Sequence, residues 1–165
     1  MGLASSARSR VPILMEEIRV LIQRLAHYPP EWELPGYATS GSAAVDLRNA
    51  GPTLVVPPLG RVLVPTGIAV ALPPGTEAQV RPRSGLALRR GLGMPNSPGT
   101  IDSDYRGEVC VPLINFDAEP QEIEHGERIA QLLVARIYRI AWEPVDRLPA
   151  DEGRGVGGFG STGRH

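Results

Sequence analysis

A short acidic turn contains the residues with the clearest capacity for chemistry. Asp102, Asp104 and Tyr105 follow Pro98-Gly99 in close succession. Carboxylates in a tight turn can bind a cation, cap main-chain N–H groups or act as a general base. The spacing leaves all three roles open. In a strand, Asp102 and Asp104 would share one face and Tyr105 would point to the other, but a hairpin turn need not follow that rule.

A second motif, Arg83-Ser84-Gly85, has the residue types that a phosphate group requires. Arginine offers a planar fork of donors, serine offers a hydroxyl, and glycine lets the main chain approach closely. An ordinary surface turn is the competing interpretation. The chain contains no lysine, so any phosphate must be held by arginine and by main-chain N–H groups.

The C-terminal residues 151–165 are rich in glycine and nearly free of aliphatic side chains. The glycine spacing after Arg154 is similar to that of dinucleotide-binding loops, but no strand-like run precedes it, which argues against such a site. Two interpretations remain: a terminus without fixed structure, and an arm carrying Phe159 that closes over an anionic ligand.

Composition excludes several classes of protein. The 17 basic and 18 acidic residues give a formal net charge of −1, which offers no general attraction for nucleic acid or an anionic membrane. The single cysteine, Cys110, excludes an internal disulfide and a cysteine-based zinc site, and its apolar neighbours predict that it is buried. No apolar run approaches the ~20 residues of a membrane span. We therefore expect a cytoplasmic protein that binds neither nucleic acid nor a membrane.

Short apolar runs separated by glycine and proline predict the strands that must position these motifs. Many such runs with close turns are typical of an all-β sandwich or barrel, and 165 residues suit one domain with its own core. One segment resists this pattern: the apolar spacing from Val11 to Leu25 favours a helix, although Ile18, Val20 and Ile22 also alternate as in a strand. The predicted strands are residues 54–56, 61–64, 67–72, 77–80, 108–116 and 128–137, with Pro65 among the breaks between them.

Five stretches occur in the order found in the trimeric dUTPase family, which the chain resembles from about Glu17 onward. The five stretches are Gly41–Leu47, Pro82–Ala87, Gly99–Gly107, Gly126–Leu132 and the glycine-rich segment from Arg154. Ala44 stands where the family usually has glycine, so we expect its φ to be negative. The resemblance also implies a strand from Glu17 to Leu25, and we adopt that expectation in place of the helix.

The resemblance implies an all-β, jelly-roll-like distorted β-barrel that assembles as a homotrimer with active sites shared between chains. Residues 1–15 would be an N-terminal extension, residues 16–150 the barrel domain, and residues 151–165 a flexible glycine-rich arm that closes the active site. The implied reaction is hydrolysis of dUTP to dUMP and pyrophosphate with Mg²⁺ on the triphosphate. It would limit uracil incorporation into DNA and supply dUMP for thymidylate synthesis.

The resemblance also implies roles for individual residues. Asp102 would activate the water that attacks the α-phosphorus, and Tyr105 would pack on deoxyribose and exclude a 2′-hydroxyl. No side chain would bind the metal directly, although Asp46 would orient its neighbours or a magnesium-bound water. The other implied contacts are Asn96 and Gly99 with the uracil edge, Arg83, Ser84, Gly85 and Gln131 with the phosphates, Arg154 with the γ-phosphate, Phe159 stacked on uracil, and Gly160 and Ser161 in the closing lid.

Two other functions are compatible with such a fold. A dCTP deaminase, or a bifunctional deaminase–pyrophosphatase, would need a catalytic glutamate in place of the Asp-x-Asp-Tyr arrangement. A regulatory binding protein without turnover would be expected to have lost motif residues. The complete set of motifs favours the hydrolase.

Overall fold

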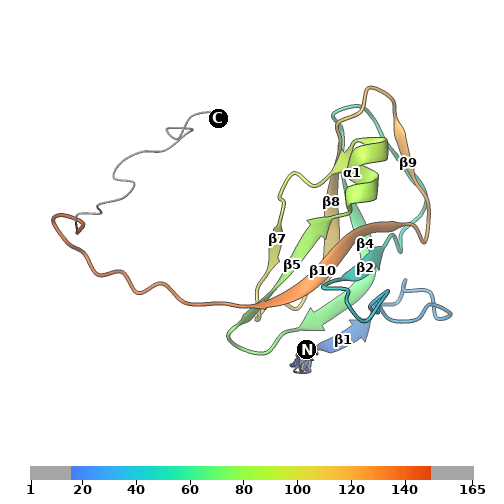
Figure 1. The fold of residues 1–165 in the computed structure, drawn as a ribbon. Coiled ribbons are helices and arrows are strands. Elements are labelled where there is room, and N and C mark those ends of the chain that lie inside the picture. Colours follow the sequence, from blue (N-terminus) through green and yellow to red (C-terminus); the bar gives the residue numbers. More distant parts are fainter. Residues whose placement is uncertain (1–15, 150–165) are drawn as a thin grey trace, which may run out of the picture.

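The computed structural model describes residues 16–149 and shows a body built almost entirely of strands (Figure 1). The all-β class predicted from the sequence is confirmed. In chain order the elements are β1 (Leu21–Arg24), β2 (Val45–Arg48), β3 (Leu54–Val56), β4 (Arg61–Ala71), β5 (Thr76–Pro82), α1 (Ser84–Arg90), β6 (Leu92–Gly93), β7 (Gly99–Ile101), β8 (Glu108–Asn115), β9 (Gln121–Ile123) and β10 (Arg128–Arg136).

The strands form two four-stranded sheets with the orders β1-β4-β8-β6 and β2-β10-β5-β7, and β3 and β9 form a small two-stranded sheet. Neighbouring strands pair antiparallel throughout these sheets. This arrangement agrees with the jelly-roll-like barrel that the family resemblance implies. Connections between the two sheets bring β7 and β8 to opposite sides of the turn at Asp102.

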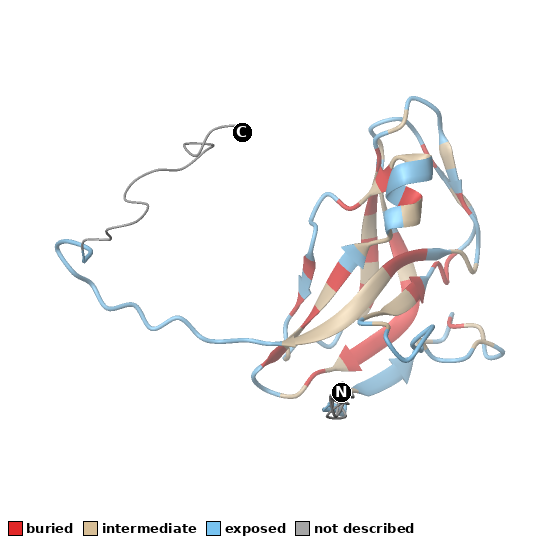
Figure 2. Cartoon of the chain, in the orientation of Figure 1, coloured by how far each residue is buried: buried red, intermediate tan, exposed pale blue. Residues whose placement is uncertain are grey.

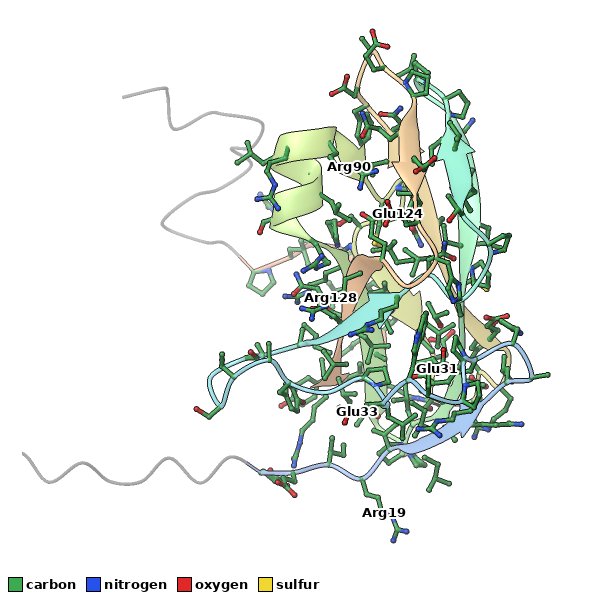
Figure 3. All side chains as sticks on the ribbon, turned by 90° about the vertical axis from the view of Figure 1, so that its right-hand side faces the viewer. Arg19, Glu31, Glu33, Arg90, Glu124 and Arg128 are labelled. Carbon is green, nitrogen blue, oxygen red and sulfur yellow. The ribbon has the colours of Figure 1, made fainter. Side chains whose placement is uncertain are left out.

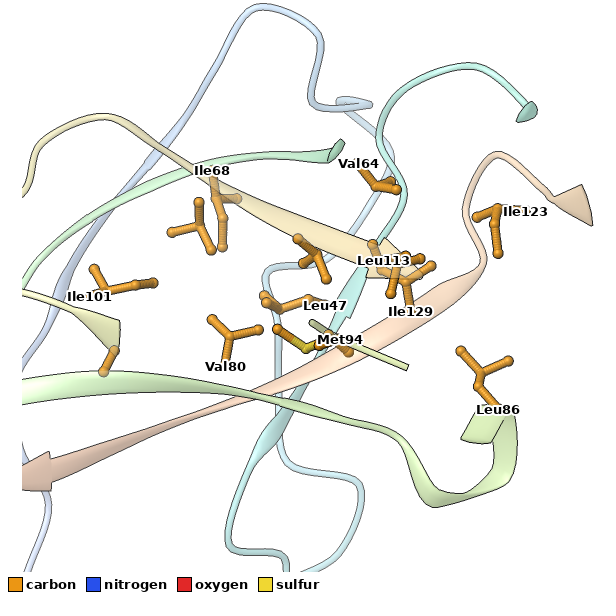
Figure 4. Packing of buried hydrophobic residues seen from close by; sticks show 14 of the residues in the cluster. Leu47, Val64, Ile68, Val80, Leu86, Met94, Ile101, Leu113, Ile123 and Ile129 are labelled. Atoms are coloured by element: carbon orange, nitrogen blue, oxygen red, sulfur yellow. The ribbon is translucent and has the colours of Figure 1, made fainter. Parts of the chain in front are cut away.

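The core lies between the two large sheets and contains side chains from both of them (Figure 4). Along β8, buried and half-buried residues alternate, as expected for a strand with one face on the core. Val64, Val111 and Leu113 come from one sheet, and Leu47 and Ile129 come from the other. These aliphatic side chains fix the two sheets against each other and thereby fix the loops at the sheet edges.

Two parts of the described chain contribute little to this core (Figure 2). All four residues of β1 are exposed, although the strand pairs with β4. Residues 137–149 leave the body after β10 and are exposed throughout. Several of their exposed side chains are large and apolar: Ile137, Tyr138, Ile140, Trp142, Val145 and Leu148.

The N-terminal strand is confirmed, but it is shorter than predicted. It covers Leu21–Arg24, which pair with Ala71–Ile68 of β4, rather than the whole of Glu17–Leu25. The apolar spacing that favoured a helix does not correspond to a buried helical face, because Leu21 is 61% exposed. Ala44 does not have positive φ, as expected; among described residues other than glycine, only Leu59 does.

The predicted break at Pro65 is wrong. Both flanking runs belong to the single strand β4, in which Pro65 pairs with Cys110 of β8. The next pair is Ala69 with Glu108, so the register shifts immediately after the proline. Proline has no N–H to donate and is tolerated at such irregularities, and Gly67 supplies a φ of 71° there.

The prediction that Cys110 is buried is also wrong, because the residue is half-buried. The strand alternation places it on the face of β8 opposite to the core residues Val109 and Val111. Partial burial, and next the carboxylate of Glu108, raise the pKa of its thiol. Among residues 16–149, no helix has the length and apolar character needed to cross a membrane.

Candidate active site

Two arginines hold the carboxylate of Asp46 at the end of the β2-β10-β5 sheet. Arg83 Nε lies 3.0 Å from Asp46 Oδ1, and Arg128 Nη1 lies 3.2 Å from Oδ2. Arg83 Nη1 also donates a hydrogen bond of 2.9 Å to the main-chain oxygen of Arg128. The carboxylate therefore fixes two guanidinium groups side by side, with side chains between a quarter and a half exposed.

Strand pairing explains why these residues meet. In β10, Gln131 lies opposite Asp46 of β2 on one side and Arg81 of β5 on the other. Gln131 Nε2 donates to the main-chain oxygen of Pro82 at 3.0 Å, at the point where β5 ends and the Arg83-Ser84-Gly85 motif begins. We refer to Asp46, Arg83, Ser84, Gly85, Arg128 and Gln131 as the phosphate-side cluster.

The short helix α1 follows directly from this cluster. Ser84 is its first residue and is exposed, and Gly91 ends it in the left-handed conformation with φ 58°. The side chain of Arg89 folds back toward the start of the helix, because a Cβ placed on Gly85 would lie 2.7 Å from Arg89 Nη2. A third guanidinium therefore lies beside the motif.

Two pockets are lined in part by residues of the phosphate-side cluster. One has a volume of about 400 Å³ and is lined by Asp46, Arg48 and Arg128 together with the loop around Trp32. The other, of about 280 Å³, is lined by Asp46, Arg81 and Gln131. Arg128 extends from the start of β10 toward this region (Figure 3). Asp46, Arg128 and Gln131 are therefore accessible to a polar ligand.

A second group of predicted residues lies on and after β7, and we call Asn96, Gly99, Asp102 and Tyr105 the hairpin cluster. Gly99 is buried, and a Cβ there would lie 3.2 Å from Asn96 Nδ2 and 3.6 Å from Val80 Cβ. Asn96 therefore packs over a glycine. This close approach leaves main-chain groups of the loop next to the amide.

The acidic stretch forms a turn rather than a strand. The main-chain N–H of Tyr105 donates to the main-chain oxygen of Asp102 at 3.1 Å. Asp102 and Asp104 are both exposed. The Tyr105 hydroxyl donates to the main-chain oxygen of Glu108 at 3.0 Å, which holds the ring against the turn. Asp102 therefore offers a solvent-accessible carboxylate beside an aromatic ring.

Asp102 lies far from the phosphate-side cluster within one chain. In the pairing of β5 with β7, Val80 lies opposite Gly99 and Ala78 lies opposite Ile101. Asp102 continues to the level of Glu77, whereas Arg83 follows the other end of β5. At about 3.3 Å per residue, this pairing separates Asp102 from Arg83 by roughly 20 Å.

The sequence-based assignments are thus divided between two groups, and some fall outside both. Arg154, Phe159, Gly160 and Ser161 lie outside the described residues. Arg89 and Arg128 were not predicted as site residues, although Arg128 lies inside the fourth motif, where its charge was a usable signal. Over residues 16–149, no three His, Cys, Asp or Glu side chains are arranged to hold a metal ion.

Comparisons with known proteins give a consistent result. A family model described as dUTPase matches residues 30–163. The chain is 53% identical over 147 residues to the deoxyuridine 5′-triphosphate nucleotidohydrolase of Anaeromyxobacter sp., covering 89% of this chain and 99% of that protein. It is 51% identical over 154 residues to the same-named protein of Wolbachia sp. subsp. Brugia malayi, covering 92% of this chain and 98% of that one.

The fold is similar to that of the Staphylococcus bacteriophage 80alpha dUTPase with dUpNHpp. The TM-score is 0.78 and the identity 24%, over 88% of this chain and 99% of that chain. At this identity the likeness concerns the fold alone, and it agrees with the antiparallel sheets described above. Since the family model spans most of the sequence and includes both residue clusters, the chain belongs to the dUTPase family.

Proposed function

We propose that this chain hydrolyses dUTP to dUMP and pyrophosphate. The observation that carries the proposal is the presence of two complementary clusters. One presents an aromatic ring, which can pack on a nucleoside, and a carboxylate, which can activate the water that attacks the α-phosphorus. The other presents arginines around Asp46, as a triphosphate requires. Membership of the dUTPase family supports the same substrate.

In this proposal Asp102 is the general base. Asp102 is exposed, so its carboxylate can reach the attacking water and accept a proton from it. General-base assistance contributes roughly 10²–10⁴ in rate. The remaining acceleration must come from alignment of the water with the α-phosphorus and from neutralisation of the phosphate charge.

The phosphate-side cluster supplies that neutralisation. The guanidinium groups of Arg83 and Arg128 offer planar forks that match phosphate oxygens, and Asp46 keeps both forks in place. Ser84 and Gly85 add a hydroxyl and a main-chain N–H. Gln131 holds the main chain at Pro82 and so fixes the motif that follows it.

Mg²⁺ fits this arrangement as an ion carried by the triphosphate. The phosphate-side cluster offers the oxygens of one half-buried carboxylate, that of Asp46. Carboxylate oxygens suit a hard cation or the water molecules bound to it. Bound there, the ion would supply further charge neutralisation on the triphosphate. Asp46 would accept a hydrogen bond from a water on the ion while retaining its arginine partners.

The nucleoside would be read by the hairpin cluster. Asn96 and the main chain around Gly99 would contact the uracil edge, and Tyr105 would pack on the deoxyribose and leave no room for a 2′-hydroxyl. Arg154, Phe159, Gly160 and Ser161 would close the site over the γ-phosphate and the base. By removing dUTP the reaction would limit uracil incorporation into DNA and would supply dUMP for thymidylate synthesis, in the cytoplasm.

The proposal includes a homotrimer with sites shared between chains. The separation of Asp102 from Arg83 by roughly 20 Å supports this, because no single triphosphate could contact both within one chain. The exposed strand β1 and the exposed apolar residues from Ile137 to Leu148 also support it, since such surfaces are typical of protein interfaces. A neighbouring chain would complete each site.

A pyrophosphate-release assay with dUTP, UTP, dTTP and dCTP tests the function directly. We expect release from dUTP in the presence of Mg²⁺, much less from the other nucleotides, and little from dUTP after chelation with EDTA. The dCTP reaction is also analysed for ammonia. Absence of pyrophosphate from dUTP, or faster release of ammonia from dCTP, would refute the proposal.

A further inference from the structure

Tyr105 lies directly over Gly107 in the turn that precedes β8. A Cβ built on Gly107 would lie 2.6 Å from Tyr105 Cζ and 3.1 Å from Cε2, with the hydroxyl also too close. Atoms cannot approach to 2.6 Å without displacement, so the ring occupies the space that a side chain at position 107 would need. A larger residue at position 107 would therefore displace the Tyr105 ring.

The requirement for glycine at this position comes from the ring and not from the backbone. The described glycines with positive φ are Gly67, Gly75, Gly91 and Gly126, and Gly107 is not among them. An alanine could therefore adopt the main-chain conformation of Gly107 without strain. Its methyl group would instead push the Tyr105 ring away from the turn.

The acceptor of the Tyr105 hydroxyl, at the same end of the ring that lies over Gly107, is itself fixed. The Tyr105 hydroxyl donates to the main-chain oxygen of Glu108. The Glu108 side chain accepts a hydrogen bond of 2.7 Å from the main-chain N–H of Gly67, and His27 Nε2 lies 2.8 Å from the same oxygen. Gly67 and His27, from two other parts of the chain, thus hold the side chain of Glu108, the residue whose main-chain oxygen accepts the hydrogen bond from Tyr105.

The turn at Asp102 is held by other hydrogen bonds than the one that holds the Tyr105 ring. The turn at Asp102 is closed by the hydrogen bond from the Tyr105 main chain. Arg106 Nη1 also donates hydrogen bonds to the main-chain oxygens of Ser103 and Tyr105, at 2.8 and 2.7 Å. These bonds involve main-chain groups of the turn and not the Tyr105 ring. The ring can therefore move while the main chain at Asp102 keeps its hydrogen bonds.

We propose that Gly107 is a specificity-determining residue, which positions the Tyr105 ring as the wall against a 2′-hydroxyl. The inference rests on the proposed function, in which Tyr105 packs on the sugar. Gly107 provides the space for the ring, and the fixed oxygen of Glu108 sets its tilt. The preference for a deoxyribonucleotide then depends on a residue that itself touches no substrate atom.

The test compares kcat/KM for dUTP and for UTP in the wild-type protein and in Gly107→Ala. We expect the ratio of the two values to fall by about tenfold or more, since the discrimination against one added group in a pocket is of this order. The fall should come from an improved reaction with UTP, with kcat for dUTP within a few-fold of wild type. Gly36→Ala is the matched control, because a Cβ there meets only Leu34 O, at 3.9 Å.

Tyr105→Phe provides a second variant that retains the ring and removes its hydrogen bond to Glu108. We expect a smaller fall in the same ratio. An unchanged ratio in Gly107→Ala would overturn the inference, as would loss of the folded state in that variant, because the backbone would then be what requires glycine. If the wild-type protein does not hydrolyse dUTP, the proposed function fails and this inference fails with it.

Discussion

Arg90 and Glu127 form an ion pair in which Arg90 Nη1 lies 2.6 Å from Glu127 Oε1. The same guanidinium donates to Gln121 Oε1 at 3.1 Å and to the main-chain oxygen of Glu122. Arg90 is the last residue of α1, and Glu127 immediately precedes Arg128. The pair therefore connects the helix that begins at Ser84 to the strand that carries an arginine of the phosphate-side cluster.

Arg90→Ala should weaken this connection and raise KM for dUTP several-fold. Because Arg90 and Glu127 are both half-buried, loss of the pair should also cost about 1–3 kcal/mol of unfolding free energy. Steady-state kinetics and urea denaturation measure the two effects. Arg19→Ala is the control, since Arg19 points away from the body (Figure 3). Equal KM values in the two variants would show that α1 is positioned without Arg90.

Asp102→Asn should retain nucleotide binding and lose most turnover. The amide preserves size and polarity but does not accept the proton from water, so we expect kcat to fall by roughly 10²–10⁴. The dissociation constant for a non-hydrolysable dUTP analogue, measured by calorimetry, should change little. Asp104→Asn should lose far less, because Asp104 has no assigned role. A near wild-type kcat in Asp102→Asn would remove the base role from this residue.

Mixing two inactive variants should restore activity if the sites are shared between chains. We expect Asp102→Asn and Arg83→Ala to be nearly inactive alone, and their co-refolded mixture to recover a measurable fraction of pyrophosphate release. Recovery is possible because some mixed sites combine an intact Asp102 from one chain with an intact Arg83 from another. The double variant, refolded alone, serves as the control. A mixture as inactive as its components would place both residues in one chain's site.

Cys110 should react more slowly with iodoacetamide at alkaline pH in the folded protein than in the unfolded protein. Burial, and next the Glu108 carboxylate, raise the pKa of its thiol above the ordinary value of 9.0. A raised folded-state pKa means that the thiol's contribution to stability is complete below the unfolded-state value and is lost as the pH rises through the folded-state value. The alkylation midpoint of folded protein should therefore exceed that of urea-unfolded protein. Coincident midpoints would contradict this.

The strands of the barrel were predictable because their signal is local. Leu54–Val56, Glu108–Asn115 and Arg128–Arg136 agree closely with runs visible in the sequence. Helix α1 was not predicted, since only Leu86 of its seven residues is buried and it has no apolar face to produce a helical period. The break expected at Pro65 failed because a proline is accommodated by the register of the partner strand, which the local sequence does not contain.

The candidate site was predictable in composition but not in arrangement. Asp102, Tyr105 and the Arg83 motif could be identified from residue type and family resemblance. Their separation depends on the pairing of β5 with β7, and the contact of Arg128 with Asp46 depends on the pairing of β10 with β2. Both are long-range relationships, so residue spacing alone could not supply them.

The pairing of β5 with β7 also has a consequence for how the enzyme would behave in a cell. If each site needs two chains, a newly synthesised polypeptide is inert until it meets its partners. Hydrolysis would then fall more steeply than in proportion to protein concentration once dilution favours dissociation, since association depends on mass action. Expression level would control not only how much enzyme is present but what fraction of it works.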